Sequence, residues 1–478
     1  MPAISHADYV RHDALGLAAL VRRKQVSAAE LLDAALARLD AVNPKLNAEA
    51  FRFVELAARQ LSEGVGEGPF AGVPFMTKDL AVMVAGAPLS SGSRAWKDNV
   101  SSIDSVITER IRAAGLVIFG STTSPELGLT STTENKVQGD THNPWKLGRI
   151  AGGSSGGAAA VVAAGVIPMA QASDGGGSIR TPASCCGLFG LKPSRGRMPM
   201  GPLRTESWNG MSVVGVVSRS VRDSAAFLDA TAGIELGARY DATPAPGGGF
   251  LASLASAPAG LRIALWTKTW NGEAIHPECV AAAEAAAKLC ESLGHRVDIV
   301  QPPVDGAALA AAFAPILMTS VAKDLEERGR ARGSPVSDDE VEPLTAFYRA
   351  RAGEVRGIDL QNAIAVQQRA AITLAGFMQN YDLILTPTQG TPPPKHGVLS
   401  LSQADFSQYG RDIGAFGPYT ALANHTGQPA MSVPLAMSED GVPIGVMFTA
   451  RYGAEATLLS LAAQLEGTRP WKDRLPDL

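Results

Sequence analysis

The chain lacks the residue patterns that mark several classes of protein. Its 478 residues include four cysteines (Cys185, Cys186, Cys279 and Cys290), too few for a disulfide framework in so long a chain. No cysteine or histidine spacing typical of a metal site occurs, so no metal is expected. The 42 basic and 46 acidic residues are interspersed and give a formal charge of −4. No basic stripe stands out, which argues against a nucleic-acid partner.

Long apolar runs and a targeting signal are also missing. Residues 1–13 carry charges where a signal peptide would need an apolar core. The most apolar long stretch, residues 156–172, consists largely of Ala, Gly and Val, contains Pro168 and is short for a membrane span. We therefore expect a soluble, cytoplasmic protein without a membrane partner.

Short apolar runs alternate with helical patterns along most of the chain. A capping box at Ser27–Glu30 opens an amphipathic helix that we expect to end near Asn43 and Pro44. Strand-like runs are expected at 72–76, 116–120, 166–170, 261–266, 296–300, 382–387, 430–435 and 444–450. This alternation predicts an α/β protein with a sheet covered on both faces. We interpret residues 1–478 as a single domain, with a helical lead-in at about 1–65 and a Gly/Pro-rich surface excursion at about 237–260.

Two Gly/Ser-rich segments are not explained by packing. They are GGSSGG at 152–157 and SDGGGSIR at 173–180. Consecutive glycines are costly in ordered structure unless the backbone must take unusual angles or approach another group closely. Such runs can aim several backbone N–H groups at one point, which suits an oxyanion or a phosphate. The two segments lie 24 residues apart (178 − 154) around one helix and one strand, which favours a shared site.

Two common explanations fit these segments poorly. The first segment matches the G-x-S-x-G nucleophile elbow, but that motif requires an apolar strand just upstream, and residues 141–146 read as a polar loop. A dinucleotide cradle would need a third glycine where Arg180 stands, and no P-loop lysine follows. Neither an α/β-hydrolase elbow nor a nucleotide site is therefore favoured.

Taken together, the motifs resemble the amidase signature family of serine hydrolases. The resemblance runs in order from about residue 15 to the C-terminus and rests on GVPFMTKD at 72–79, GGSSGG at 152–157, DGGGSIR at 174–180 with Pro182, Cys186-Gly187, GLKP at 190–193, TGQPAMSVP at 426–434 and GVPIG at 441–445. It implies a three-layer α/β/α fold, with a mixed central sheet covered by helices on both faces, and chemistry without a cofactor.

The family uses a Ser–cisSer–Lys triad, which the resemblance places on Ser178, Ser154 and Lys78. Ser178 matches the nucleophile, Ser154 the serine after a cis peptide, and Lys78 the base. Such a triad is chemically reasonable, because a serine hydroxyl needs an adjacent base and a lysine can be that base only when burial and nearby positive groups keep it neutral. The relay can later return a proton to the leaving amine.

The resemblance also implies residues that support the triad. The backbone N–H groups of Gly175, Gly176, Gly177 and Ser178 would form the oxyanion hole. Asp174 and Arg180 would brace this loop through hydrogen bonds and charge pairing, and we expect the Ser155 side chain to hydrogen-bond the loop. The neighbouring thiols Cys185 and Cys186 are interpreted as packing residues.

Four positions depart from the usual family pattern. Gly175 stands where Thr, Ile or Ala is common, Ala151 where Pro often occurs, Thr77 where an aliphatic residue is usual, and Met447 where Gln is frequent. None of these departures removes a group of the triad. They bear on substrate preference.

Within the family, segments at 132–134, 143–145, 190–197 and 201–203 are similar to bacterial amidases of the 6-aminohexanoate cyclic dimer hydrolase type. The expected partner is a small amide, but carbamates react by the same attack, so urethane hydrolysis stays open. A function as the glutamine-amidase A subunit of a tRNA-dependent amidotransferase also stays open. A homodimer stays open, because the sequence does not disclose the oligomeric state. We expect the pocket to use the segment after Lys78, residues 125–140, 200–210 and 308–350, with 387–410 as a lid.

Overall fold

The structure is a computed structural model that describes residues 4–270, 272 and 274–478. Its N-terminal part contains α1 (His6–Arg11), α2 (Ala14–Arg22), α3 (Ala28–Leu46), β1 (Glu49–Arg52), α4 (Val54–Glu63), β2 (Pro74–Lys78), η1 (Arg94–Trp96), α5 (Val106–Ala113) and β3 (Val117–Thr122). The middle part contains η2 (Glu126–Gly128), β4 (Glu134–Asn135), β5 (Gly139–Asp140), β6 (His142–Asn143), β7 (Lys146–Ile150), α6 (Gly156–Ala163), β8 (Met169–Asp174), α7 (Arg180–Cys186), β9 (Phe189–Lys192), β10 (Val213–Ser218), α8 (Val221–Thr231) and α9 (Gly249–Ser253).

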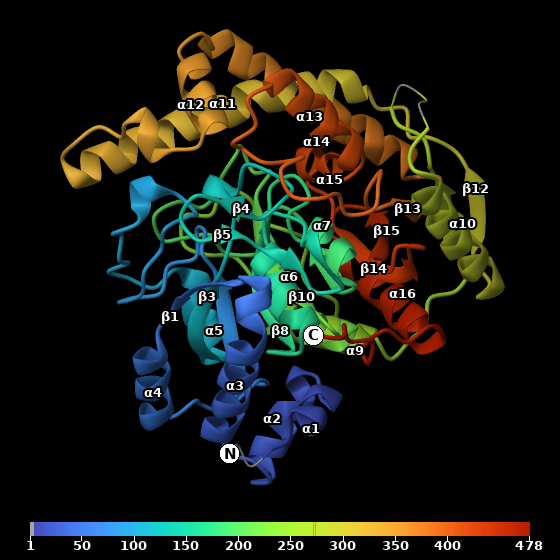
Figure 1. Ribbon diagram of the computed structural model, residues 1–478. Helices are drawn as coiled ribbons and strands as arrows, with labels where there is room; N and C mark the ends of the chain where they lie inside the picture. The colour runs from blue at the N-terminus through green and yellow to red at the C-terminus, as the bar shows by residue number, and fades with distance from the viewer. Residues whose placement is uncertain (1–3, 271, 273) are drawn as a thin grey trace.

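The C-terminal part completes the central sheet and adds the long helices at the upper end of the molecule (Figure 1). It contains β11 (Arg262–Leu265), α10 (Pro277–Ser292), β12 (Arg296–Ile299), α11 (Gly306–Arg332), η3 (Asp338–Glu340), α12 (Pro343–Ala352), α13 (Gly357–Phe377), β13 (Leu383–Pro387), α14 (Phe406–Phe416), α15 (Ala421–Thr426), β14 (Ala430–Met437), β15 (Pro443–Ala450) and α16 (Glu455–Thr468).

The central sheet is mixed and has the strand order β12-β11-β13-β15-β14-β9-β10-β8. The pairs β12–β11 and β11–β13 are parallel, and the remaining pairs are antiparallel. A second sheet, β1-β3-β2, continues beyond β8, because β2 lies beside β8 and the backbone N–H of Lys78 donates to Oε1 of Gln171 on β8 (2.8 Å). This junction joins the ends of β2 and β8, where the site lies.

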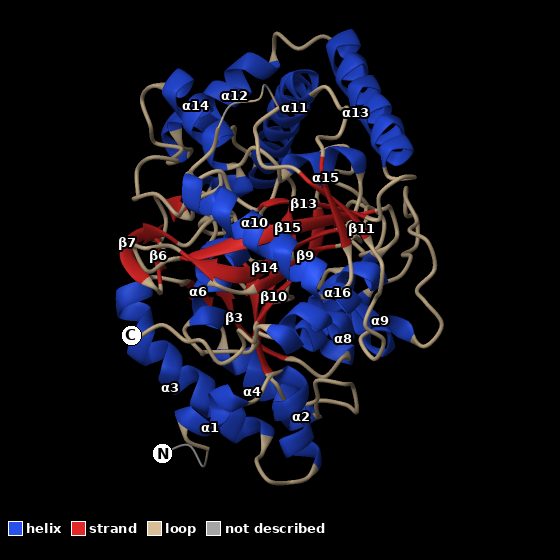
Figure 2. Ribbon diagram, turned by 90° about the vertical axis from the view of Figure 1, so that its right-hand side faces the viewer, coloured by secondary structure: helices blue, strands red, loops and turns tan. Residues whose placement is uncertain are grey.

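Alternating side chains place a hydrophobic layer on each face of the sheet. On β13, Leu383 and Leu385 pack into the cluster that contains α8, α10 and α16, whereas Ile384 packs on the opposite side with residues of α13 and α15. On β8, Met169 joins the first cluster and Ala170 joins a cluster with α6 and α7. Helices therefore cover both faces (Figure 2), and the predicted three-layer α/β/α fold is confirmed.

Local differences from the predicted elements lie mainly at boundaries. The helical lead-in contains a strand, β1, that pairs with β3, and α3 continues through Pro44 to Leu46. The strand predicted at 166–170 is displaced to β8, because residues 166–168 only lead from α6 into the sheet. The segment upstream of GGSSGG forms a β6–β7 hairpin where a polar loop was expected.

One apolar cluster contains residues from Ile4 to Trp471, which supports the single-domain interpretation, although this organisation stays a prediction. Within the expected excursion at 237–260, α9 packs Phe250 into that cluster.

Among the described residues, one helix, α11, is long and apolar enough to cross a membrane by length and composition alone. Its surroundings are those of a helix packed on protein: it contacts α12 and α13. Its C-terminal half contributes Asp324, Glu327 and Arg328 to the wall of a cavity.

Candidate active site

Lys78 ends strand β2 and is completely buried. Its Nζ lies 2.7 Å from Oγ of Ser154 and 3.0 Å from Oγ of Ser173. Burial lowers the pKa of Lys78 to about 7, and the charge of Asp174 opposes this shift only in part. A substantial fraction of the lysine is therefore neutral near pH 7, and a neutral amine can accept a proton.

Ser154 is held by a loop that runs against the segment 132–133. The Gly153–Ser154 peptide bond is cis. A Cβ atom at Gly153 would lie 2.2 Å from the carbonyl oxygen of Thr132, so only glycine fits this close approach. Ser155 follows, and its hydroxyl donates to the carbonyl oxygen of Ser173 and accepts from the Ser173 N–H, both at 3.3 Å. The loop and the end of β8 are thus tied together.

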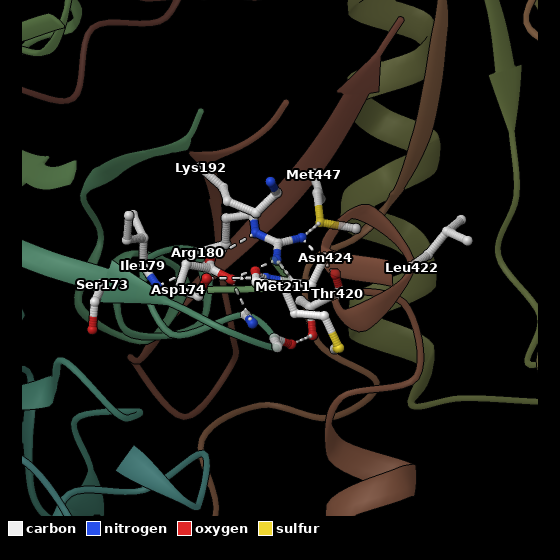
Figure 3. Close-up of polar contacts among 12 residues, drawn as sticks. Ser173, Asp174, Ile179, Arg180, Lys192, Met211, Thr420, Leu422, Asn424 and Met447 are labelled. Atoms are coloured by element: carbon white, nitrogen blue, oxygen red, sulfur yellow. Dashed lines mark hydrogen bonds and ion pairs between the residues drawn. The ribbon is translucent and has the colours of Figure 1, made fainter. Parts of the chain in front are cut away.

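Asp174, the last residue of β8, organises the loop that carries Ser178 (Figure 3). Its carboxylate accepts hydrogen bonds from the backbone N–H groups of Gly177 (2.8 Å) and Ile179 (3.1 Å), on either side of the serine. The buried Arg180 guanidinium donates to both oxygens of the same carboxylate (3.0 and 2.9 Å). Burial alone would raise the pKa of the Asp174 carboxyl. The paired charge of Arg180 outweighs burial and holds this pKa well below its usual range.

The bond from Gly177 to Asp174 changes the predicted oxyanion hole. Because the Gly177 N–H already donates to a carboxylate, this group is engaged in the structure and is not free to bind a substrate oxygen. The N–H groups of Gly175, Gly176 and Ser178 have no hydrogen-bond partner within the part of the chain that the structure describes. Three of the four predicted donors are therefore available.

Ser154, Ser173 and Ser178 line one cavity of about 460 Å³. Its wall also includes Leu80, Ala81, Met83, Leu89, Ser91, Trp96, Asn99, Val100, Ser101, Ser102, Ile103, Leu127, Gly128, Gly175, Met200, Leu203, Arg204, Ser207, Trp208, Ser212, Asp324, Glu327, Arg328 and Ala331. Ser178 is partly exposed to this cavity, and its hydroxyl makes no hydrogen bond to any described residue. The wall of one cavity thus holds an unengaged serine together with Ser154, the hydrogen-bond partner of Lys78.

The lining agrees with several of the predicted pocket segments and contradicts one. The segment after Lys78 contributes, as do residues 127–128, 200–208 and the C-terminal half of α11. The loop at 387–410 contributes no described residue to this wall. It packs elsewhere, since the carbonyl oxygen of Pro394 accepts from the Ile150 N–H (3.0 Å), so the lid prediction is wrong.

Sequence reasoning missed several residues that support the site. Ser173 contacts the lysine directly, and its only sequence signal was its place beside Asp174. Asn424 lies in α15, and Thr420 is the residue just before this helix. The Thr420 hydroxyl donates to the carbonyl oxygen of Gly176 (2.6 Å), and the Asn424 amide donates to the Asp174 carboxylate (2.8 Å). Because Thr420 and Asn424 lie about 245 residues from the Ser178 loop in the sequence, no local pattern linked them to it.

Other candidate groups lie outside the reacting centre. Burial raises the pKa of the Cys185 and Cys186 thiols, so they are poor thiolates. Glu134, Asp140 and His396 bring potential metal ligands within 4.8 Å of one another. Glu134 already accepts from the Thr132 hydroxyl and the Gly397 N–H, and His396 hydrogen-bonds His142, so the cluster is interpreted as structural.

Comparison with known proteins identifies the family of the chain. The amidase family profile matches residues 30–459. The 6-aminohexanoate-cyclic-dimer hydrolase of Paenarthrobacter ureafaciens is 39% identical over 98% of this chain and 96% of its own length. The structure of a 6-aminohexanoate cyclic dimer hydrolase complexed with substrate is similar with a TM-score of 0.93, at 38% identity over 98% of this chain and 99% of that one.

A bacterial aryl acylamidase of the amidase signature family is also similar, with a TM-score of 0.87 at 25% identity over 96% of each chain. The family profile and these relatives span nearly the whole chain. The chain therefore belongs to the amidase signature family and is a hydrolase that acts on the C–N bond of amides.

Proposed function

We propose that Ser178 is the nucleophile of this amidase and that Ser154 and Lys78 form its proton relay. The observation that carries the proposal is the buried Lys78, whose Nζ lies 2.7 Å from Ser154 in the cavity wall that also holds Ser178. A serine hydroxyl is weakly nucleophilic unless a base removes its proton. Because its pKa is lowered, Lys78 can supply such a base in the form of a neutral amine.

In the first half-reaction, Oγ of Ser178 attacks the amide carbonyl carbon. Its proton passes to Ser154, whose own proton passes to the neutral amine of Lys78. The negative charge on the substrate oxygen is stabilised by the N–H groups of Gly175, Gly176 and Ser178. The C–N bond breaks as the proton returns through Ser154 to the leaving nitrogen, which departs as an amine.

In the second half-reaction, water attacks the ester carbon of the acyl-enzyme. Its proton follows the same route to Lys78 and then returns to Oγ of Ser178, which releases the carboxylic acid. No cofactor takes part in either step. Asp174 and Arg180 act as positioning residues, because they fix the backbone on both sides of Ser178.

The substrate class proposed is a small carboxylic amide with apolar substituents. The names of the relatives, a cyclic-dimer hydrolase and an aryl acylamidase, support cyclic, oligomeric or aryl amides. A urethane would acylate Ser178 in the same way, so carbamate hydrolysis is the second candidate. An amidotransferase subunit is the third, and it would need a partner for full activity. We also assign the protein to the bacterial cytoplasm, consistent with its bacterial relatives.

The test uses the purified chain alone with linear amides, aryl amides, a cyclic amide dimer, glutamine and aryl carbamates. We expect turnover of apolar amides without any partner, at least tenfold faster than of matched carbamates. Ser178→Ala and Lys78→Ala are expected to abolish this turnover while melting cooperatively, and Ser154→Ala to reduce it by a hundredfold or more. Near-normal turnover by folded Ser178→Ala would contradict the mechanism, and activity confined to glutamine would favour the amidotransferase function.

A further inference from the structure

An indole ring fills the space that a side chain at Gly175 would need. A Cβ atom at Gly175 would lie 2.7 Å from both Cε3 and Cζ3 of Trp208, closer than real Cβ contacts come. Gly175 is the third residue before Ser178, in the loop that offers N–H groups to the cavity. Trp208 and Ser178 line the same cavity. The indole therefore lies directly against the loop of the nucleophile.

The position of Trp208 is fixed by its backbone and by its neighbours. Trp208 and Asn209 both have φ of +53°, a region that bulky residues rarely adopt unless the surroundings impose it. The Asn209 amide donates to Oε1 of Gln367 on α13 (2.8 Å). The rings of Trp208 and of Phe313 on α11 form a T-shaped contact, with centroids 6.1 Å apart and an interplanar angle of 72°. The indole is thus a fixed part of the wall.

The rest of the cavity is suited to uncharged groups. Leu80, Met83, Leu89, Leu127 and Met200 provide apolar surface. Each charged side chain of the lining already has a partner. Arg204 pairs with Asp324 (3.2 Å), Glu327 pairs with Lys323 (2.7 Å), and Arg328 donates to the Ala95 carbonyl oxygen (2.8 Å) and lies over the Trp96 ring. Three of these four charges are thus neutralised in ion pairs and Arg328 is engaged by neutral acceptors, so the lining attracts a charged substituent weakly, whereas its apolar side chains can contact an apolar one.

We propose that Trp208 is a specificity-determining residue whose indole binds an uncharged apolar substituent of the scissile amide, and that Gly175 is required because it leaves room for this ring. The inference rests on the proposed role of Ser178 and adds a substrate preference to it. Trp208 and Gly175 form a matched pair, so a larger residue at 175 should be tolerated only when the indole is removed.

The experiment is a double-mutant cycle with Gly175→Ala, Trp208→Ala and the combined variant. Two series of amide substrates are compared: acetyl against hexanoyl p-nitroanilide, which differ in the acyl group, and hexanoyl methylamide against hexanoyl p-nitroanilide, which differ in the amine. In at least one series, Trp208→Ala is expected to lower the preference for the larger apolar group, measured as a ratio of kcat/KM, at least tenfold. Gly175→Ala should lower kcat/KM at least tenfold. The combined variant should have a kcat/KM at least fivefold higher than that of Gly175→Ala alone.

Trp208→Phe provides a conservative control, because it keeps an aromatic face and should retain most of the selectivity. Unchanged preference in both series for Trp208→Ala, or a combined variant whose loss equals the product of the two single losses, would overturn the inference. Labelling by a small fluorophosphonate separates this failure from failure of the proposed function. If the variants are labelled at Ser178 but show no change in preference, only the role of Trp208 is wrong, whereas an unlabelled wild type contradicts the role of Ser178.

Discussion

Lys78 combines complete burial with two hydroxyl partners, and its chemistry follows from both. Burial penalises the ammonium form, while Ser154 and Ser173 remain close enough to exchange hydrogen bonds with either form. A neutral amine has one lone pair and two N–H groups. It can accept a proton from Ser154 while it donates to Ser173, which orients the lone pair toward the relay.

The pH dependence of catalysis should report this lysine. Because only the neutral amine accepts a proton, kcat/KM should rise with pH, reach half its maximum near pH 7 and level off above about pH 8. The measurement is kcat/KM for an uncharged amide between pH 5 and 9. A rate that falls with increasing pH across this range would show that the ammonium form is the active one.

The residues of the triad could be placed from sequence because they lie inside contiguous motifs. Glycine runs leave a visible pattern, since each glycine meets a close approach such as that of Gly153 to Thr132. Ser173 was visible only as part of such a motif. Trp208 could not be recognised, because its contact with Gly175 depends on how two loops meet.

At the scale of the elements, one buried guanidinium connects the strands and helices around the site. Arg180 of α7 donates to Asp174 of β8, to the Thr420 carbonyl oxygen (2.8 Å) and to Asn424 of α15 (2.7 Å). It also contacts Sδ of Met447 on β15 (3.3 Å). The notable substitution of Met for the usual Gln at 447 thus places a weak sulfur acceptor beside the guanidinium. This one side chain therefore connects two distant parts of the sequence, β8 with α7 and α15 with β15.

Replacing Arg180 by methionine should therefore be severe. The change leaves the Asp174 carboxylate buried without its counter-charge, and breaking a buried pair in this way costs about 3–5 kcal/mol. We expect a loss of that size in the free energy of unfolding, measured by urea titration, together with loss of amide turnover. The exposed pair Arg330–Glu326 provides the control, since Arg330→Met should change stability by less than about 1 kcal/mol. Equal small effects of both variants would contradict the role given to Arg180.

The order and type of most elements could be predicted from hydrophobic periodicity, whereas their boundaries and pairings could not. The strand β1 escaped prediction because its four residues lie between α3 and α4 and are stabilised by pairing with β3, a non-local contact. The lid was misassigned for a similar reason. Aromatic residues in a Pro-rich region suggested a cover, but Tyr409 and Phe416 are buried in the packing of α14.

At the scale of the whole molecule, two buried lysines make the stability of the fold depend on pH. Burial lowers the pKa of Lys192, on β9, to about 7, as it does for Lys78. Both folded-state values lie below the ordinary lysine value of 10.5. Above pH 7 the unfolded chain therefore binds more protons than the folded one, and this contribution to stability increases as the pH rises from 7 toward 10.

Lys192→Met isolates one of these contributions. Between pH 7 and 8.5, the free energy of unfolding of the wild type should increase by about 1–2 kcal/mol more than that of the variant, because the variant no longer releases this proton on folding. Urea unfolding at the two pH values measures the difference. The exposed Lys288→Met is the control and should follow the wild type. A variant with the same pH dependence as the wild type would show that Lys192 stays charged in the folded protein.

The assignment of Ser178 as nucleophile is tested most directly by intact-protein mass spectrometry after treatment with a fluorophosphonate. Wild type and Ser178→Ala are compared at pH 8, where Lys78 is mostly neutral, and the adduct is located by peptide mapping. We predict one adduct on the wild type, mapped to Ser178, and none on the folded variant. An adduct on another residue, an equally labelled variant, or a folded wild type that takes up no label would contradict the assignment.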